Sequence, residues 1–215
     1  MIGSSRRLPG VVLIAVATIP LIGQTEEEPS AFAPVTDAML ADPPAEDWLT
    51  WRRTNDAWGY SPLDQITAAN VAELEQVWTR PLRRGSQTAT PLVYDGVIYM
   101  PNPNDVIQAL DAVTGELIWE HARETPESAR RMAGLLGGNN RNIAIYGNLI
   151  IDTGIDASLF ALDAETGEMV WQNLVLDYRE NPAIQGAGPI IANGKAVSGR
   201  SCLPYRGPHA CVIVA

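Results

Sequence analysis

The chain has 215 residues and a formal net charge of −10 at pH 7, because 25 Asp and Glu outnumber 15 Lys and Arg. Such an acidic chain is a poor match for nucleic acid or for an anionic membrane surface, which both attract basic patches. The length fits one or two ordinary domains, and the composition suits a protein of the extracytoplasmic space.

The first 24 residues have the features of an export signal. A basic pair, Arg6 and Arg7, precedes an apolar stretch at 11–23 that Pro20 interrupts. This stretch is too short to span a membrane as a helix, so we predict a signal peptide over 1–24 and no transmembrane domain in the mature chain. A short membrane anchor or a misassigned start is the alternative. The export signal predicts a periplasmic or otherwise extracytoplasmic protein.

The next segment, 25–46, is rich in Glu, Ala and Pro, which predicts an acidic, Pro-rich linker. Folded structure is expected to begin near Asp47. Further along, Thr67 is a plausible N-cap for one short helix over 67–75. The residues that follow, 76–81, are a candidate closing strand.

One string of residues occurs twice and indicates a repeat architecture. Ala-Leu-Asp-Ala-x-Thr-Gly-Glu-x-x-Trp stands at 109–119 and again at 161–171, and the copies start 52 residues apart. A fixed period near fifty is typical of repeats that each form one supersecondary unit. The Asp can accept a backbone N–H within a turn, and the Gly supplies the positive φ at its end. The Trp is expected in the outermost strand, where its ring can cover a glycine of the neighbouring unit.

Short β-rich runs precede each copy, at 91–110 and at 143–162, and Asp-Gly or Gly-Asn pairs split them as in hairpins. Each unit therefore predicts four antiparallel strands, which is one propeller blade. A third unit begins at 189–199. We predict an all-β fold, a β-propeller of four-stranded antiparallel blades, with two full blades and part of a third within 47–215. A propeller closes with roughly four to eight blades, so we expect the N-terminal part of a longer protein.

The chain has two cysteines, Cys202 and Cys211, and both lie in an insertion of the third unit. In an exported protein an even number of cysteines usually means a disulfide, and we predict that bond here. Free buried thiols or half of a metal site are the alternatives. Zinc is disfavoured, because no His partner stands at ligand spacing.

The chain resembles the quinoprotein alcohol dehydrogenases, eight-bladed propellers that carry pyrroloquinoline quinone (PQQ) and a calcium ion in the central channel. The resemblance rests on both Asp-Ala-x-Thr-Gly turns and on four further segments, which are 55–70, Thr90-Pro91, Asn140-Arg141 and Gly186-Ala-Gly-Pro189. The turn alone is shared with non-enzymatic relatives, whereas the N-terminal segment points more narrowly to the dehydrogenases. The resemblance implies an exported PQQ-dependent enzyme that oxidises an alcohol or related hydroxy compound and passes electrons to a cytochrome or a quinone.

The resemblance also implies candidate cofactor-binding residues, which are Arg141, Asn140, Thr88 and Gln87. Arg141 falls where the family places an arginine against the PQQ carboxylates, and a planar guanidinium can pair a carboxylate bidentately. A surface or inter-blade arginine is the alternative. Thr88, with Gln87 beside it, stands where the family commonly has a glutamate.

Other positions depart from the family pattern. Gly186 stands where a threonine is expected, and 202–204 reads Cys-Leu-Pro where many members place a calcium-ligating glutamate. Because carboxylates supply most of the affinity for calcium, the metal is held from later blades, or this subgroup arranges its cofactor differently, or the chain is a degenerate member. The family's catalytic aspartate lies in later blades, so no catalytic residue is predicted. The rival hypothesis is a non-catalytic propeller of the same repeat family that acts as a scaffold or binding protein in the cell envelope.

Overall fold

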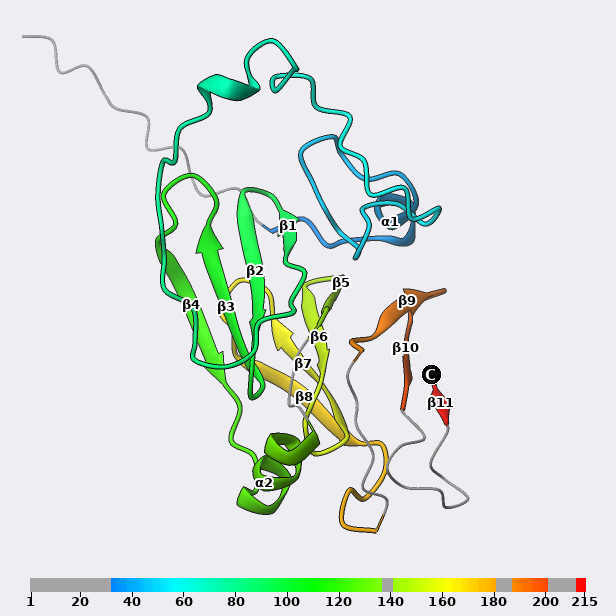
Figure 1. Ribbon diagram of the computed structural model, residues 1–215. Helices are drawn as coiled ribbons and strands as arrows, with labels where there is room; N and C mark the ends of the chain where they lie inside the picture. Colours follow the sequence, from blue (N-terminus) through cyan, green and yellow to red (C-terminus); the bar gives the residue numbers. More distant parts are fainter. Residues whose placement is uncertain (1–31, 137–140, 181–186, 201–211) are drawn as a thin grey trace, which may run out of the picture. The chain divides into compact units, whose positions relative to one another are not determined.

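The computed structural model describes residues 32–136, 141–180, 187–200 and 212–215, and these ranges form three antiparallel sheets (Figure 1). The strands are β1 (Leu92–Tyr94), β2 (Val97–Asn102), β3 (Val106–Asp111), β4 (Leu117–Ala122), β5 (Ala144–Tyr146), β6 (Leu149–Thr153), β7 (Ser158–Asp163), β8 (Met169–Leu174), β9 (Ile190–Ala192), β10 (Lys195–Gly199) and β11 (Ile213–Val214). The helices are α1 (Asp37–Ala41), α2 (Glu127–Leu136) and a 3₁₀ turn, η1 (Val71–Glu73).

The sheets follow the repeat that the sequence predicts. Strands β1 to β4 pair in chain order as blade 1, and β5 to β8 pair in chain order as blade 2. Ala109 lies opposite Trp119, Ala161 lies opposite Trp171, and each pair is followed by the same shift of register. The third sheet, with β9, β10 and β11, begins another unit. The predicted all-β propeller architecture, with two full blades and part of a third, is confirmed.

The Asp-Ala-x-Thr-Gly turn is stabilised within itself. One carboxylate oxygen of Asp111 accepts hydrogen bonds from the backbone N–H of Thr114 at 2.7 Å and from its hydroxyl at 2.9 Å. These bonds lower the pKa of Asp111. Asp163 accepts the corresponding pair from Thr166. The same local chemistry therefore closes both blades.

Trp119 joins the two blades. It is buried, and a Cβ added to Gly167 of blade 2 would lie 2.6 Å from its ring. Its indole N–H donates to the carbonyl oxygen of Ala164 at 2.9 Å. The predicted cover of a neighbouring glycine by this tryptophan is confirmed.

A similar contact fixes the segment before β1, although not as predicted. The ring of Trp78 covers Gly115, and its indole N–H donates to the carbonyl oxygen of Ala112 at 3.2 Å. No strand is assigned at 76–81, because side chains rather than a backbone ladder attach this segment. The predicted helix over 67–75 is reduced to η1.

The segment assigned to a linker packs onto the blades from Phe32 onward. Val35 forms a backbone bridge with Gly147, and the side chains of Val35 and Leu40 belong to the same buried cluster as the strands. The hydroxyl of Thr36 accepts the N–H of Met39 and begins α1. A few apolar anchors thus override an acidic, Pro-rich composition, and folded structure begins before Asp47.

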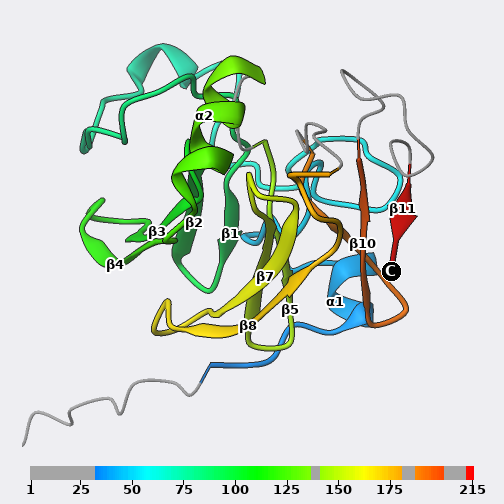
Figure 2. The same ribbon diagram turned by 90° about the horizontal axis from the view of Figure 1, so that it is seen from below.

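Helix α2 connects the blades and was not predicted. It lies at the end of the sheets where β4 finishes and β5 begins (Figures 1 and 2). Glu127 and Arg131 form an ion pair one turn apart at 2.8 Å, which favours the helix weakly. Among the described residues, no helix is both long and apolar enough to cross a membrane.

Candidate cofactor-binding site

The starts of β1, β5 and β9 are tied together at one end of the sheets. The backbone N–H of Thr90 donates to the carbonyl oxygen of Arg141 at 2.7 Å. The N–H of Gly188 donates to the side-chain oxygen of Asn142 at 3.1 Å. A third bond runs from the Thr153 hydroxyl to the carbonyl oxygen of Ala187 at 3.3 Å. These bonds bring the residues that precede three inner strands to a common end.

Gly188 allows the closest of these approaches. A Cβ at this position would lie 1.6 Å from the backbone oxygen of Asn142, so any side chain would collide with the main chain. In the Gly-x-Gly-Pro sequence that marks the third unit, the second glycine is therefore required because no side chain fits there. It lets the third sheet dock against the strand that follows Arg141.

The predicted site residues divide into those that the structure describes and those that it does not. Arg141, Thr88 and Gln87 are exposed at the tied end, and Arg141 forms no ion pair with any described residue. The Arg141 guanidinium and the Thr88 hydroxyl form no hydrogen bond with another residue of the described ranges, and such groups fit a ligand with several carboxylates. Asn140 lies outside the described residues, as do Cys202 and Cys211.

A buried network beside Gln87 was not predicted. The Gln87 amide donates to Asn102 at 3.0 Å, and Asn102 in turn contacts Gln108 at 3.2 Å. Gln108 donates to Glu120 at 2.8 Å, and Glu120 pairs with Arg83. The sequence offered only one sign of this network, which is a set of polar residues at the end of an apolar strand. The same pattern equally predicts an ordinary loop.

A second buried cluster joins the blades through Arg123. Its guanidinium bonds to Asp105 of blade 1 at 2.5 Å and to Asp156 of blade 2 at 2.6 Å, and all three side chains are at most 8% exposed. Asp105 also accepts the N–H of Ile155 at 3.1 Å. The cluster is saturated by its own members, so it is a link between blades rather than a ligand site.

Burial and charge act against each other in this cluster. Burial raises the pKa of Asp105, although Arg123 opposes the shift. Burial also favours the neutral form of Asp156, but hydrogen bonds from Arg123 and Ser158 outweigh it and lower the pKa. Burial disfavours the cation of Arg123, yet its bonds to Asp156 and the charge of Asp105 raise the pKa. Arg123 thus favours the ionised form of both carboxylates, and burial opposes it at both.

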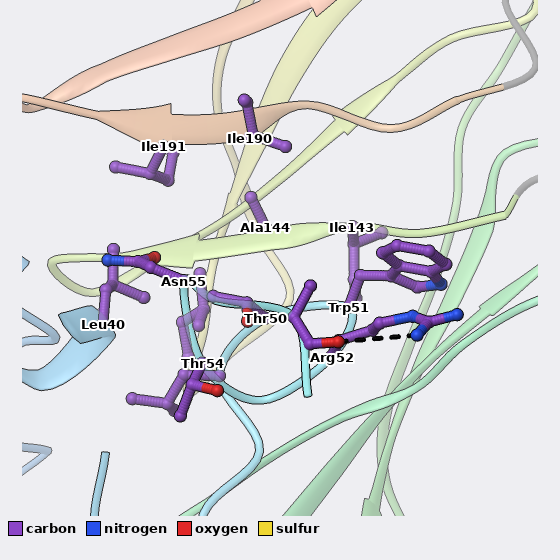
Figure 3. Close-up of a pocket in the computed structure, with 13 residues that line it drawn as sticks. Leu40, Thr50, Trp51, Arg52, Thr54, Asn55, Ile143, Ala144, Ile190 and Ile191 are labelled. Atoms are coloured by element: carbon purple, nitrogen blue, oxygen red, sulfur yellow. Dashed lines mark hydrogen bonds between the residues drawn. The ribbon is translucent and has the colours of Figure 1, made fainter. Parts of the chain in front are cut away.

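An apolar pocket of about 240 Å³ lies between the N-terminal segment and the starts of two inner strands (Figure 3). Leu40 and Trp51 line it from the N-terminal segment, and Ile143 and Ile190 line it from the blades. Arg52 is the one cationic side chain among the lining residues, which are otherwise mostly apolar. The pocket therefore does not match a ligand with several acidic groups, in contrast to the surface around Arg141.

The part of the chain that the structure describes supplies no metal centre of its own. No group of three or more His, Cys, Asp or Glu side chains in the described ranges is placed to hold a metal ion. A hard cation such as calcium takes six to eight oxygen ligands. Carboxylates supply most of the affinity for such an ion, and the described ranges assemble no such cluster.

The comparison with known proteins agrees with the blades and their register. The sequence model of one protein family, described as the glucose/ethanol/alcohol dehydrogenase β-propeller domain that uses PQQ, matches residues 48–177. The chain belongs to this family of quinoprotein dehydrogenases. The match begins in the N-terminal segment and ends after β8, so it includes both full blades.

Curated relatives are quinoprotein alcohol dehydrogenases. The chain is 38% identical to quinoprotein alcohol dehydrogenase PedH of Pseudomonas putida over 143 residues, which are 65% of the chain and 23% of the relative. It is also 38% identical to quinohemoprotein alcohol dehydrogenase ADH-IIG of Pseudomonas putida over 166 residues, 75% of the chain and 22% of that protein. The chain thus spans less than a quarter of the length of these relatives.

Solved structures show the same fold. The quinohemoprotein alcohol dehydrogenase ADHIIG of Pseudomonas putida HK5 matches with a TM-score of 0.70 at 36% identity, over 80% of this chain and 26% of that one. A europium-containing methanol dehydrogenase matches with a TM-score of 0.66 at 24% identity, over 74% and 28%, which supports the fold alone. The family model and the curated relatives, rather than this likeness of fold, favour the dehydrogenase family over the non-catalytic scaffold that the repeat by itself allowed.

Proposed function

We propose that the whole protein is an exported PQQ-dependent dehydrogenase that oxidises an alcohol or a related hydroxy compound. The observation that carries this proposal is the backbone bond between Thr90 and Arg141, which brings Arg141 to the same end of the inner strands as Thr88 and Gln87. Family membership indicates PQQ as the cofactor, and the exposed polar groups at this end can bind its carboxylates.

The residues at the tied end suit the chemistry of PQQ. Its three carboxylates call for a cation and for hydrogen-bond donors, and Arg141 and the hydroxyl of Thr88 offer both. We place Asn140 and Gln87 in the same site. When bound, PQQ would accept the electrons that leave the alcohol. The role of this chain is to hold and orient the cofactor by charge and hydrogen bonds.

The substrate and the electron acceptor are proposed from relatives. One of them is named 1-butanol dehydrogenase (cytochrome c) and comes from Thauera butanivorans. It is 36% identical over 156 residues, which are 71% of this chain and 22% of that protein. We propose a small alcohol as substrate and a cytochrome or a quinone as acceptor.

The remaining proposals concern groups outside the described residues. A signal peptide over 1–24 would export the protein to the periplasm, where a disulfide between Cys202 and Cys211 could form. Calcium would assist the cofactor in the whole protein, with ligands from outside the described ranges.

The test uses the full-length apoprotein, to which PQQ and calcium are added. We expect PQQ to bind and dye-linked oxidation of simple alcohols to follow. Arg141→Met should weaken PQQ binding by about tenfold to a hundredfold, since a hydrogen bond to a charged group contributes about 1.5–3 kcal/mol. Arg141→Lys should recover part of the affinity, because lysine keeps the charge without the planar fork.

Arg131→Met is the matched control, since Arg131 is an exposed arginine that pairs with Glu127 on α2. It should bind PQQ as the wild type does. Absence of PQQ binding and of turnover over a broad panel of alcohols would reject the proposed function.

A further inference from the structure

Asn102 is a buried amide whose hydrogen-bonding capacity is fully used. Its side chain is 0% exposed at the end of β2. The oxygen accepts the backbone N–H of Arg83 at 3.2 Å and the Gln87 amide at 3.0 Å. The nitrogen donates to the carbonyl oxygen of Met100 at 3.1 Å and to Gln108 at 3.2 Å. An asparagine side chain can make four such bonds, and this one makes all four.

The partners of Asn102 determine which way each amide points. A backbone N–H can only donate and a backbone carbonyl can only accept, so Arg83 and Met100 fix the oxygen and nitrogen of Asn102. The Gln87 group that faces the Asn102 oxygen must therefore be its nitrogen. That nitrogen also lies 3.4 Å from the carbonyl oxygen of Arg83, which uses its second hydrogen. The carbonyl oxygen of the Gln87 side chain accepts no hydrogen bond from a described residue, and Gln87 is exposed, so this oxygen is available to a ligand.

The network closes on itself across blade 1. Gln108 turns its oxygen to Asn102 and its nitrogen to Glu120, whose carboxylate can only accept. Glu120 then pairs with the guanidinium of Arg83, and the backbone of Arg83 returns to Asn102. The segment before β1 runs beside β4 and then crosses the sheet to β1 (Figure 1). The network attaches that segment to β4 through Glu120 and to β2 through Asn102.

The network is not a general part of a blade. The repeat places Gly154 at the position of Asn102 and Phe160 at the position of Gln108, 52 residues further on. Blade 2 folds with the same strand order and register without these amides. The shared blade pattern therefore does not require these amides. Asn102 bonds directly to the segment that carries Gln87, and Gln108 is linked to that segment through Asn102 and Glu120.

We propose that Asn102 is a positioning residue that orients Gln87 so that its carbonyl oxygen faces the cofactor. This inference rests on the proposed function of the site. Gln87 then recognises an N–H or O–H group of the ligand, while Arg141 recognises its carboxylates. A ligand with acidic groups and one hydrogen-bond donor, as PQQ has in its pyrrole N–H, matches both residues.

The experiment is a double-mutant cycle on PQQ binding by the full-length protein, read as the dissociation constant in an equilibrium titration. Gln87→Met keeps the length of an exposed side chain and removes its amide, both the oxygen and the nitrogen that donates to Asn102. We expect it to raise the dissociation constant about 3- to 10-fold, the worth of one hydrogen bond. Asn102→Leu should cause a similar loss alone and no further loss in the Gln87→Met background, because it acts through Gln87.

Asn102→Asp is the variant that keeps the acceptor, because one of its oxygens still accepts from Arg83 and Gln87, whereas the other replaces the nitrogen that donates to Met100 and Gln108 and so costs stability. It should retain the wild-type affinity for PQQ even if it lowers the melting temperature. Hydrogen exchange of the Arg83 backbone amide, which donates to Asn102, should be faster than in the wild type in Asn102→Leu and unchanged in Asn102→Asp. That result would show that the variants are folded and that the loss of PQQ affinity follows from the loss of this acceptor.

The outcomes separate the two proposals. If the wild-type protein does not bind PQQ, the proposed function and this inference both fall. If it binds PQQ and Gln87→Met binds equally well, the positioning role is wrong and the proposed function stands. Additive losses in the double variant would likewise overturn it, since they would show that Asn102 does not act through Gln87.

Discussion

Blade 1 and blade 2 differ most at the end where their inner strands begin, although the same turn closes both. In blade 1, Asn102 and Gln108 form a hydrogen-bonded network. In blade 2, Gly154 and Phe160 occupy the same repeat positions and make room for Arg123. A Cβ on Gly154 would collide with its guanidinium, which lies 5.1 Å from the centre of the Phe160 ring.

Both blades receive an arginine from the segment that precedes them, but in different surroundings. Arg83 follows Trp78 by five positions and Arg123 follows Trp119 by four. The side chain of Arg83 is 54% exposed, whereas that of Arg123 is 2% exposed. The residues shared by the two repeats form the blade, and the residues that differ between them determine which polar side chains each blade contacts.

The largest expected effect tests the buried arginine. Arg123→Met would leave Asp105 and Asp156 buried without their countercharge, so we expect a loss of about 3–5 kcal/mol in the free energy of unfolding. The measurement is urea denaturation with comparison of m-values. Arg83→Met is the matched control and should lose far less, because water reaches its ion pair with Glu120. Equal losses would contradict the contrast between the blades.

The second prediction tests the contact between blades with two glycines of equal backbone conformation. Gly167 and Gly96 both have φ of +72°, but only Gly167 has a ring, that of Trp119, where a Cβ would stand. Gly96→Ala should cost about 1–2 kcal/mol for the left-handed backbone. Gly167→Ala should add about 1–3 kcal/mol for overpacking against Trp119. Thermal unfolding of the two variants measures the difference, and an equal shift would argue against tight packing at this contact.

The smallest expected effect concerns the turn that the blades share. The hydrogen bonds from Thr114 hold the folded pKa of Asp111 below its unfolded value, so the stabilisation is present above that value and lost as pH falls through the folded pKa. The difference in unfolding free energy between the wild type and Asp111→Asn should therefore be constant near pH 6 and shrink below about pH 4.

Asp64→Asn serves as the control for this pH dependence, because Asp64 is exposed and forms no hydrogen bond with a described residue. A pH-independent difference for Asp111→Asn would show that ionisation of this carboxylate does not stabilise the turn.

The sequence by itself determined the blade, its period and its register. The reason is that these depend on short-range chemistry: the Asp111 turn satisfies its own hydrogen bonds within four residues, and the alternation of the strands sets which face is buried. The family resemblance also followed from sequence, and the structure joins two of the residues that carry it, Thr90 and Arg141, by a backbone hydrogen bond.

Only the tertiary structure decided which partners are contacted by the polar residues and by the segment that composition assigned to a linker. Composition assigned Val35 to a linker, but a bridge to Gly147, 112 positions away, holds it in the core. Likewise, Gln87 was expected as a cofactor ligand, but its orientation depends on Asn102 and through it on Arg83. Contacts of this kind join residues distant in sequence, and neither periodicity nor composition records which donor meets which acceptor.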